Sequence, residues 1–119
     1  MNLLSGDEKT KKFVTNVGLI TSSGPHGDNI MSAEWTHQAS YSPGIIIISI
    51  GNKKATLENI KKTKEFGVSL AAVDQIVIAS VAGKTSGREF DKIKALKEIG
   101  CSFYKANKIK ALMVDGAVH

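Results

Sequence analysis

Apolar, β-branched residues in the first third of the chain predict two short strands. Phe13 to Thr21 is such a run, and a cluster of turn formers from Ser22 to Asp28 follows it. The pattern predicts a strand, a tight loop and a second strand that begins at Asn29. From Asn29 to Ser40, small, polar and aromatic residues mix without a regular period, so we expect strand structure only at the start of this segment.

The strongest β signal lies in the middle of the chain. Tyr41 to Gly44 has the composition of a turn, and Ile45 to Ile50 then brings five isoleucines into six positions. We therefore expect Ile45 to Ile50 to be a central strand. By contrast, Met1 to Lys12 is polar and basic without strand or helix periodicity, which predicts a loosely held segment.

The second half of the chain is dominated by helical spacing interrupted by short apolar runs. The elements expected there are a helix with Thr56 as N-cap and Leu57 and Ile60 on its apolar face, a short strand from Phe66 to Leu70, a helix from Val73 to Ala82, a loop from Lys84 to Gly87, a helix from Phe90 to Ile99 closed by Gly100, and a last strand between Ile109 and His119.

This order of elements predicts a mainly β fold with peripheral helices. Strands come first, and helices then alternate with short strands, which is typical of an antiparallel sheet or small barrel with helices packed outside it. A length of 119 residues suits one domain, residues 1–119, built around one hydrophobic core.

Composition excludes several classes of protein. The longest apolar run, Ile45 to Ile48, is far shorter than the ~20 residues that span a bilayer, so we expect a cytoplasmic protein with no membrane partner. A single cysteine, Cys101, has no second Cys or His at metal-ligand spacing, so we expect neither a disulfide framework nor a metal site.

The net charge of +5 indicates an anionic ligand only weakly. Arg88 is the one arginine among 16 basic residues, and the lysines are scattered rather than massed. Aromatic residues make up 6% of the chain and none is interleaved in a basic patch, which argues against a nucleic-acid partner. A solvated lysine surface is the simplest interpretation.

The segment from Gly51 to Thr56 has the features of a phosphate site. Such a site needs free backbone N–H groups, cations and small residues that let the ligand approach. The start of a helix at Thr56 offers the N–H groups, Lys53 and Lys54 supply charge, and Gly51 and Ala55 are small. The glycine spacing of a P-loop is absent. Taken alone, the segment is more simply interpreted as a strand-to-helix loop with ordinary capping.

The segment from Asn29 to Trp35 is unusual for a core strand because polar residues interrupt its apolar positions. Asn29 and Ser32 have side chains that hydrogen-bond the polar edge of a flat aromatic ligand such as a flavin, and Met31 and Ala33 have side chains that pack on its face. A core role is the simpler interpretation of Trp35.

Further along, Arg88 follows a Ser-Gly turn, where it would bind a phosphate or carboxylate, or pair with Glu89 or Asp91 on the surface. The surface pair is favoured by spacing. His26, His37 and His119 belong to no arrangement that resembles a catalytic triad, and no nucleophile has an evident base.

Four segments in order resemble the flavin reductase-like, FMN-binding split-barrel family. The segments are Asn29 to Trp35, Ser40 to Pro43, Lys54 to Ile60 with Glu65 and Phe66, and Ser86 to Lys92. The resemblance implies an FMN-binding split β-barrel and a homodimer with the flavin near the interface. It also implies a flavoprotein of the flavin reductase type, a NAD(P)H-dependent oxidoreductase in which electrons from a nicotinamide nucleotide or a protein donor pass through flavin to an acceptor.

The resemblance also assigns cofactor-binding residues. Those that would line the isoalloxazine ring are Asn29, Met31, Ser32, Ala33 and Trp35; those that would hold the ribityl chain and phosphate are Gly51, Asn52, Lys54, Ala55 and Thr56; Ser86 and Arg88 would complete the cofactor or donor side. Because the chain stops at His119, where relatives continue, we expect the C-terminal strands of the family to be missing. Two alternatives stay open: a non-catalytic FMN-binding electron carrier, and a truncated member that has lost flavin binding.

Overall fold

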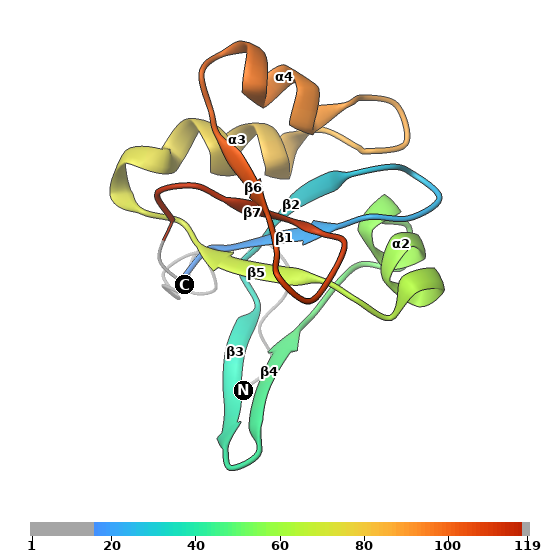
Figure 1. The fold of residues 1–119 in the computed structure, drawn as a ribbon, viewed down its shortest axis with the longest axis vertical. Helices are drawn as coiled ribbons and strands as arrows, with labels where there is room; N and C mark the ends of the chain where they lie inside the picture. Colours follow the sequence, from blue (N-terminus) through green and yellow to red (C-terminus); the bar gives the residue numbers. More distant parts are fainter. Residues whose placement is uncertain (1–15, 118–119) are drawn as a thin grey trace, which may run out of the picture.

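A three-stranded antiparallel sheet forms the centre of the protein (Figure 1). The structure is a computed structural model that describes residues 16–117, so the predictions for residues 1–12, for the start of the first strand and for the last two residues lie outside the described part. β1 (Gly18–Ser22) lies in the middle, between β2 (Asn29–Ala33) and β5 (Gly67–Leu70). Among the described residues, one edge of β2 therefore has no strand partner. The predicted strand, loop, strand succession and the short strand at Phe66 to Leu70 are confirmed.

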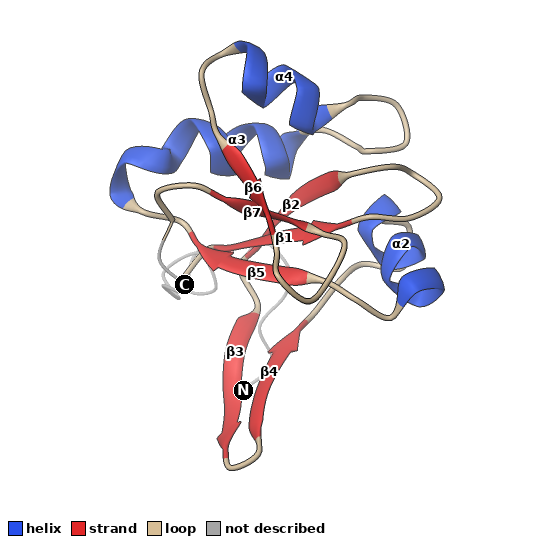
Figure 2. Ribbon diagram, in the orientation of Figure 1, coloured by secondary structure: helices blue, strands red, loops and turns tan. Residues whose placement is uncertain are grey.

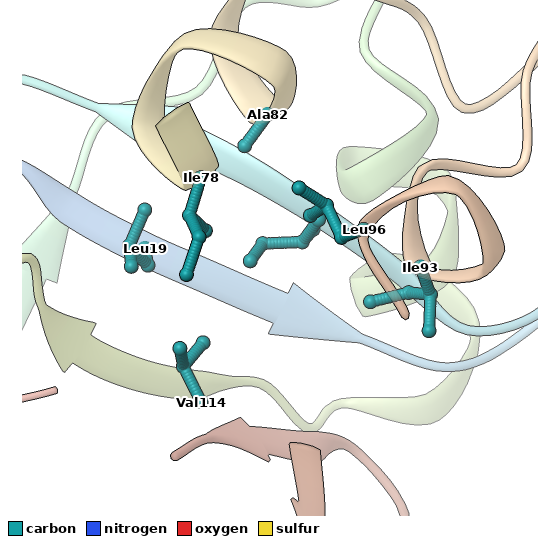
Figure 3. Close-up of a cluster of buried hydrophobic side chains, with 7 residues drawn as sticks. Leu19, Ile78, Ala82, Ile93, Leu96 and Val114 are labelled. Atoms are coloured by element: carbon teal, nitrogen blue, oxygen red, sulfur yellow. The ribbon is translucent and has the colours of Figure 1, made fainter. Parts of the chain in front are cut away.

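The sheet buries apolar side chains on both faces, because successive residues of a strand point to opposite sides. Leu19 and Ile30 belong to a cluster with residues of two helices and the last strand, which Figure 3 shows pointing toward one another. Ile20 and Met31 belong to a second cluster that includes Ile48, Ile50, Phe66 and Val68 at its margin. The β1–β2 pair thus separates two small cores.

The helices and remaining strands surround this sheet (Figure 2). Their bounds are α2 (Ala55–Thr63), the 3₁₀ turn η1 (Val73–Gln75), α3 (Ile76–Lys84), α4 (Lys92–Glu98), β6 (Phe103–Lys105) and β7 (Leu112–Val114). α3 and α4 pack on β2, while α2 packs against β1 and β2. Within residues 16–117 no helix is both long enough and apolar enough to cross a membrane.

The predicted helices and last strand are confirmed with changes at their ends. The predicted second helix begins with the turn η1. The predicted third helix, Phe90 to Ile99, is shorter in the structure, where α4 is Lys92–Glu98. Ile93 and Leu96 are buried, whereas Phe90 and Ile99 are exposed. Gly100 closes the third helix with a φ of +97°, which favours glycine. β6 was not predicted.

Two strand predictions are wrong in position. The segment after Ala33 is not irregular: β3 (Thr36–Tyr41) pairs with β4 (Gly44–Ile48) in a hairpin that projects from the body (Figure 1). The isoleucine run is therefore not a central strand, and Ile45, Ile46 and Ile47 are 44%, 50% and 51% exposed. β-Propensity reports that a residue suits a pleated surface and does not report which sheet receives the strand.

The predicted cap of α2 is also wrong. Lys54 is the N-cap and offers no side-chain cap, while Thr56 lies inside the helix. The buried face of α2 carries Ala55, Thr56 and Asn59, whereas Leu57 and Ile60 are half-buried. The Thr56 hydroxyl is used in a tertiary hydrogen bond, which explains why a good capping residue does not cap.

Candidate functional site

A cleft of about 280 Å³ runs beside the unpaired edge of β2, and we call it the β2-edge cleft. Its walls are β2, the start of α2, the end of α3 and the connection from α3 to α4. Seven of the predicted site residues line it: Asn29, Met31, Ser32, Lys54, Ala55, Thr56 and Ser86. Three segments that lie far apart in the sequence therefore meet at one place.

A hydrogen bond between two buried side chains joins β2 to α2 in this cleft. The Asn29 side-chain amide donates to Thr56 Oγ1 over 3.0 Å. The Asn29 carbonyl oxygen and the Thr56 hydroxyl hydrogen remain suited to bind a further polar group. Because both residues are buried, their rotamers are held by packing as well as by this bond.

Two glycines let the end of α3 and the α3–α4 connection approach β2 closely. A Cβ on Gly87 would lie 2.4 Å from the Asn29 side-chain oxygen, and a Cβ on Gly83 would lie 3.3 Å from the Cβ of Ser32. Ser32 donates its hydroxyl to the Ala79 carbonyl oxygen over 2.5 Å, which fixes α3 to β2. Glycine at Gly87 is therefore required by the narrowness of the cleft.

Lys92 is a buried cation in the same cleft. It is 3% exposed, and its Nζ donates to the carbonyl oxygens of Ile30 and Ala82, each over 2.9 Å. No ion pair found among residues 16–117 includes Lys92. Burial and, to a smaller extent, the charge of Lys54 lower the pKa of Lys92 from 10.5 to about 8.

The sequence interpretation missed Lys92 as a candidate site residue, although a signal for it was present. Lys92 precedes the buried Leu96 by four residues, so both lie on one face of α4. A lysine on the apolar face of an amphipathic helix needs a polar partner inside the fold. Here it has two carbonyl oxygens and no carboxylate.

The free edge of β2 also presents backbone groups. The Ile30 carbonyl points to this edge, since Lys92 binds it there. Backbone groups of alternate residues point to the same edge of a strand, so Ser32 presents its N–H and C=O to the cleft as well. The cleft therefore has donors and acceptors independent of its side chains.

The remaining predicted residues lie elsewhere. Trp35 is 62% exposed and does not line the cleft. Gly51 and Asn52 are exposed outside its lining, and Ala33 is buried in the core cluster with Ile20 and Met31. The structure thus brings together three of the five predicted ring-binding residues and three of the five residues predicted to hold the ribityl chain and phosphate.

Arg88 does not make the surface pair that sequence spacing favoured. Its guanidinium forms an ion pair with Glu58, and its Nε donates to the Lys53 carbonyl oxygen over 3.0 Å. Neither Glu89 nor Asp91 is its partner. The contact depends on α2 lying beside the α3–α4 connection, which spacing along the chain does not reveal.

His26 has a partner as well. Its Nε2 lies 2.5 Å from the second carboxylate oxygen of Glu58. Hydrogen bonds from Arg88 and then from His26 lower the pKa of Glu58 to about 2. The three side chains join the β1–β2 loop, α2 and the α3–α4 connection, and so hold these segments together.

Comparison with known proteins gives a consistent result. Residues 10–119 match the family described as the flavin reductase like domain. An uncharacterized protein of Pyrococcus abyssi is 28% identical over 95 residues, which are 78% of this chain and 52% of that protein. One from Archaeoglobus fulgidus is 27% identical over 88 residues, or 74% of this chain and 48% of that protein. The chain therefore spans about half the length of these relatives.

Solved structures share the fold. Flavoredoxin of Desulfovibrio vulgaris (Miyazaki F) superposes with a TM-score of 0.78 at 23% identity, over 98% of this chain and 62% of that chain. An FMN-binding protein from Thermus thermophilus with bound 1-cyclohex-2-enone gives 0.81 at 21%, over 98% and 61%. The NADH:FAD oxidoreductase of Streptomyces globisporus C-1027 gives 0.78 at 18%, over 98% and 70%. The predicted split-barrel class, mainly β with peripheral helices, is confirmed.

Proposed function

Because the chain belongs to the flavin reductase like domain family, we propose that it is a flavoprotein that binds FMN in the β2-edge cleft. The observation that carries the proposal is the pair of cations Lys54 and Lys92, which line one cleft together. Burial is the main cause of the lowered pKa of Lys92, and the charge of Lys54 adds to it. Two cations held close together without a carboxylate between them favour an anion at that place. The FMN phosphate, a dianion, has the required charge.

The rest of the cleft fits the other parts of FMN. Ribityl hydroxyls need both donors and acceptors, which the Asn29 amide and the Thr56 hydroxyl supply. The isoalloxazine ring needs polar contacts along one edge and apolar packing on a face, which the backbone at Ser32 and the Met31 side chain supply.

When bound, the flavin supplies the hydride and electron-transfer chemistry. The residues of this chain bind, orient and partly desolvate it. N–H groups at the free edge of β2 stabilise negative charge on the polar edge of the ring. NAD(P)H or a protein donor would deliver the electrons, and the similarity in fold to an NADH:FAD oxidoreductase supports a nicotinamide nucleotide as the donor.

A homodimer is part of this proposal. A volume of about 280 Å³ is small beside the ~300–1,000 Å³ of ordinary ligand pockets, so one chain leaves part of a flavin uncovered. Trp35 and isoleucines of the β3–β4 hairpin, which follow β2 in the sequence, are exposed. A second copy that covers the hairpin would bury this apolar surface and bring a further wall to the ring.

Binding titrations with FMN and riboflavin test the assignment. Lys54→Ala removes a charged contact to phosphate worth ~1.5–3 kcal/mol, so we expect the Kd for FMN to rise roughly 10- to 100-fold while that for riboflavin changes little. Lys61→Ala, a lysine on the exposed face of α2, is the matched control and should change neither. Absence of FMN binding to the unaltered protein in equilibrium dialysis at micromolar concentration would refute the cofactor assignment.

Turnover separates a reductase from an electron carrier. We expect the FMN-loaded protein to oxidise NADH or NADPH when free flavin or ferric ion is added. If the protein retains FMN but oxidises neither NADH nor NADPH, the interpretation that remains is an electron carrier that receives electrons from a protein donor.

A further inference from the structure

Exposed lysines from two segments that lie far apart in the sequence come together on one part of the surface. One group lies at the end of α2, in its last turn and at its C-cap, and the other group lies in the β6–β7 hairpin. We call the set the lysine patch, and its members are Lys61, Lys62, Lys64, Lys105, Lys108 and Lys110. The lysines are scattered along the chain, so only the fold reveals this patch.

Two contacts hold the two segments together. The Glu65 carboxylate, which follows α2, accepts from the Lys110 backbone N–H over 3.2 Å. A Cβ on Gly67 would lie 2.9 Å from the Met113 sulfur and 3.5 Å from the Leu112 carbonyl oxygen, so β7 packs directly on the start of β5. Figure 1 accordingly shows the turn between β6 and β7 beside the connection from α2 to β5. The two groups of lysines therefore lie on adjoining segments.

The lysine patch carries a charge equal to the net charge of the whole chain. Its six lysines and Glu65, which lies between the two segments, sum to a formal charge of +5, and the net charge of all 119 residues is also +5. The remaining 10 basic and 10 acidic residues therefore cancel. No ion pair found among residues 16–117 includes a lysine of the patch, and the carboxylate of α2, Glu58, is bound to Arg88 and His26. The patch is thus a concentrated positive charge on an otherwise balanced chain.

Compensation of a helix dipole explains only half of the lysine patch. Cations near the end of a helix stabilise the partial negative charge of its last carbonyl groups, which accounts for the three lysines at the end of α2. The three lysines of the β6–β7 hairpin have no such role. Like charges on adjoining segments repel one another, which costs free energy of folding. An anionic surface that docks on the patch offsets that repulsion.

The patch is made of lysine, which favours a carboxylate-rich protein over a nucleic acid as its partner. Ammonium groups on flexible stems stay hydrated and exchange among many carboxylates, whereas recognition of phosphate and bases typically uses the planar guanidinium of arginine. The single arginine of the chain, Arg88, is bound to Glu58. Charge complementarity of this kind raises the association rate more than the affinity, as short-lived electron-transfer encounters require.

We propose that the lysine patch docks an electron-transfer protein with a carboxylate-rich face, an inference that rests on the proposed function of the β2-edge cleft. The helix α2 connects the two places, since Ala55 and Thr56 at its start line the cleft and Lys61 and Lys62 lie in its last turn. A helix of nine residues is about 13 Å long, so the docked protein lies about one helix length from the cleft.

Stopped-flow reduction of the FMN-loaded full chain by a photoreduced, acidic [4Fe–4S] ferredoxin tests the inference. Each encounter transfers one electron from the reduced cluster to the flavin. The patch variants are two double changes, and the control makes the same charge change on α4; the patch pairs are Lys61→Glu with Lys64→Glu and Lys108→Glu with Lys110→Glu, and the control pair is Lys94→Glu with Lys97→Glu.

We expect each patch variant to lower the second-order rate constant at low ionic strength by at least about 10-fold, and the control to lower it by less than about 3-fold. The rate constant of the unaltered protein should fall as salt is added, because salt screens the attraction between the two surfaces. The patch variants should show a weaker dependence on salt. The Kd for FMN should be the same in all these proteins.

Three results overturn the inference and leave the proposed function intact, provided that FMN binds normally. The first is that the ferredoxin does not reduce the unaltered, FMN-loaded protein. The second is that the patch variants and the control lower the rate constant equally. The third is that a single-stranded oligonucleotide binds at the patch, with affinity lost in the patch variants, while the reaction with ferredoxin is unaffected by them; the partner would then be a nucleic acid. Failure of the unaltered protein to bind FMN overturns both proposals.

Discussion

Lys92 should make FMN binding depend on pH. Its pKa of about 8 means that the free protein releases this proton above about pH 8, whereas a phosphate dianion beside the ammonium holds the proton in place. We therefore expect FMN affinity to fall by up to about tenfold per pH unit between pH 8 and 10, because binding must recover the proton. Calorimetry across this range should show the fall for FMN but not for riboflavin, and Lys92→Gln should abolish it.

The same residue should affect stability in the absence of ligand. The folded pKa of Lys92 is lowered from 10.5 to about 8, so burial of its charge costs stability at all pH values below about 8. Between about pH 8 and 10.5 only the unfolded chain keeps the proton, and the free energy of unfolding rises with pH. Urea unfolding at pH 7.5 and 9.5 should show this gain relative to Lys92→Gln. An equal pH response in both proteins would contradict it.

Gly87→Ala tests whether the narrow cleft matters. The new Cβ would lie 2.4 Å from the Asn29 side-chain oxygen, so the amide must move and lose its bond to Thr56. A buried hydrogen bond left unmade costs ~1–3 kcal/mol, and we expect thermal unfolding to show a loss of that size together with at least ~10-fold weaker FMN binding. Gly44→Ala, where the added methyl meets only a carbonyl oxygen at 4.0 Å, is the control.

At the scale of elements, the β3–β4 hairpin forms a two-stranded sheet of its own among the described residues 16–117. Ile45 and Ile47 share one face of β4 because they are two residues apart. Ile46 lies on the opposite face and lines a small cavity with Val68 and Leu70. The outer isoleucines are thus the ones that a second copy would cover.

Ile47→Lys should break the proposed homodimer without unfolding the subunit. The side chain is already half exposed, so the lysine is tolerated in a monomer but places an unpaired charge in a dimer interface. Sedimentation velocity across a dilution series should show a dimer for the unaltered protein and a monomer for the variant, with weaker FMN retention. Ile99→Lys, an exposed isoleucine after α4, should remain dimeric. If the Ile47→Lys variant stays dimeric, the dimer interface lies somewhere other than on this face of the hairpin.

At the scale of the whole molecule, FMN should stabilise the fold, since the cleft exists only when β2, α2 and the α3–α4 connection are assembled. A ligand at 100 times its Kd adds about 2.7 kcal/mol to the free energy of unfolding. For a chain of this length the melting temperature should rise by roughly 10 °C, measured by far-ultraviolet circular dichroism. Riboflavin at the same concentration should raise it less. An unchanged melting temperature with saturating FMN would mean that binding does not need the folded cleft.

Local patterns in the sequence determined most of the elements and the candidate chemistry. The strand at Gly18, the turn before Gly44, and the helices around Leu57, Ile78 and Leu96 all follow from residues near one another in the chain. The grouping of Asn29 to Trp35 with Lys54 to Thr56 came from the resemblance to the flavin reductase-like family. Propensity, turn composition and helical period act over a few residues, so the elements that depend on them can be predicted from the sequence.

Tertiary structure alone decided the position and partner of each element. The isoleucine run formed a strand as predicted, but only assembly of the sheet made it a projecting arm. Arg88 forms an ion pair with Glu58, and Thr56 accepts a hydrogen bond from Asn29. Lys92 is held in the cleft by hydrogen bonds to two carbonyl oxygens. Three of these contacts join residues 27 to 62 positions apart, and the contact from Lys92 to the Ala82 carbonyl oxygen joins residues 10 apart. Burial then sets the charge of Lys92, because desolvation is a property of the assembled fold and not of the residue.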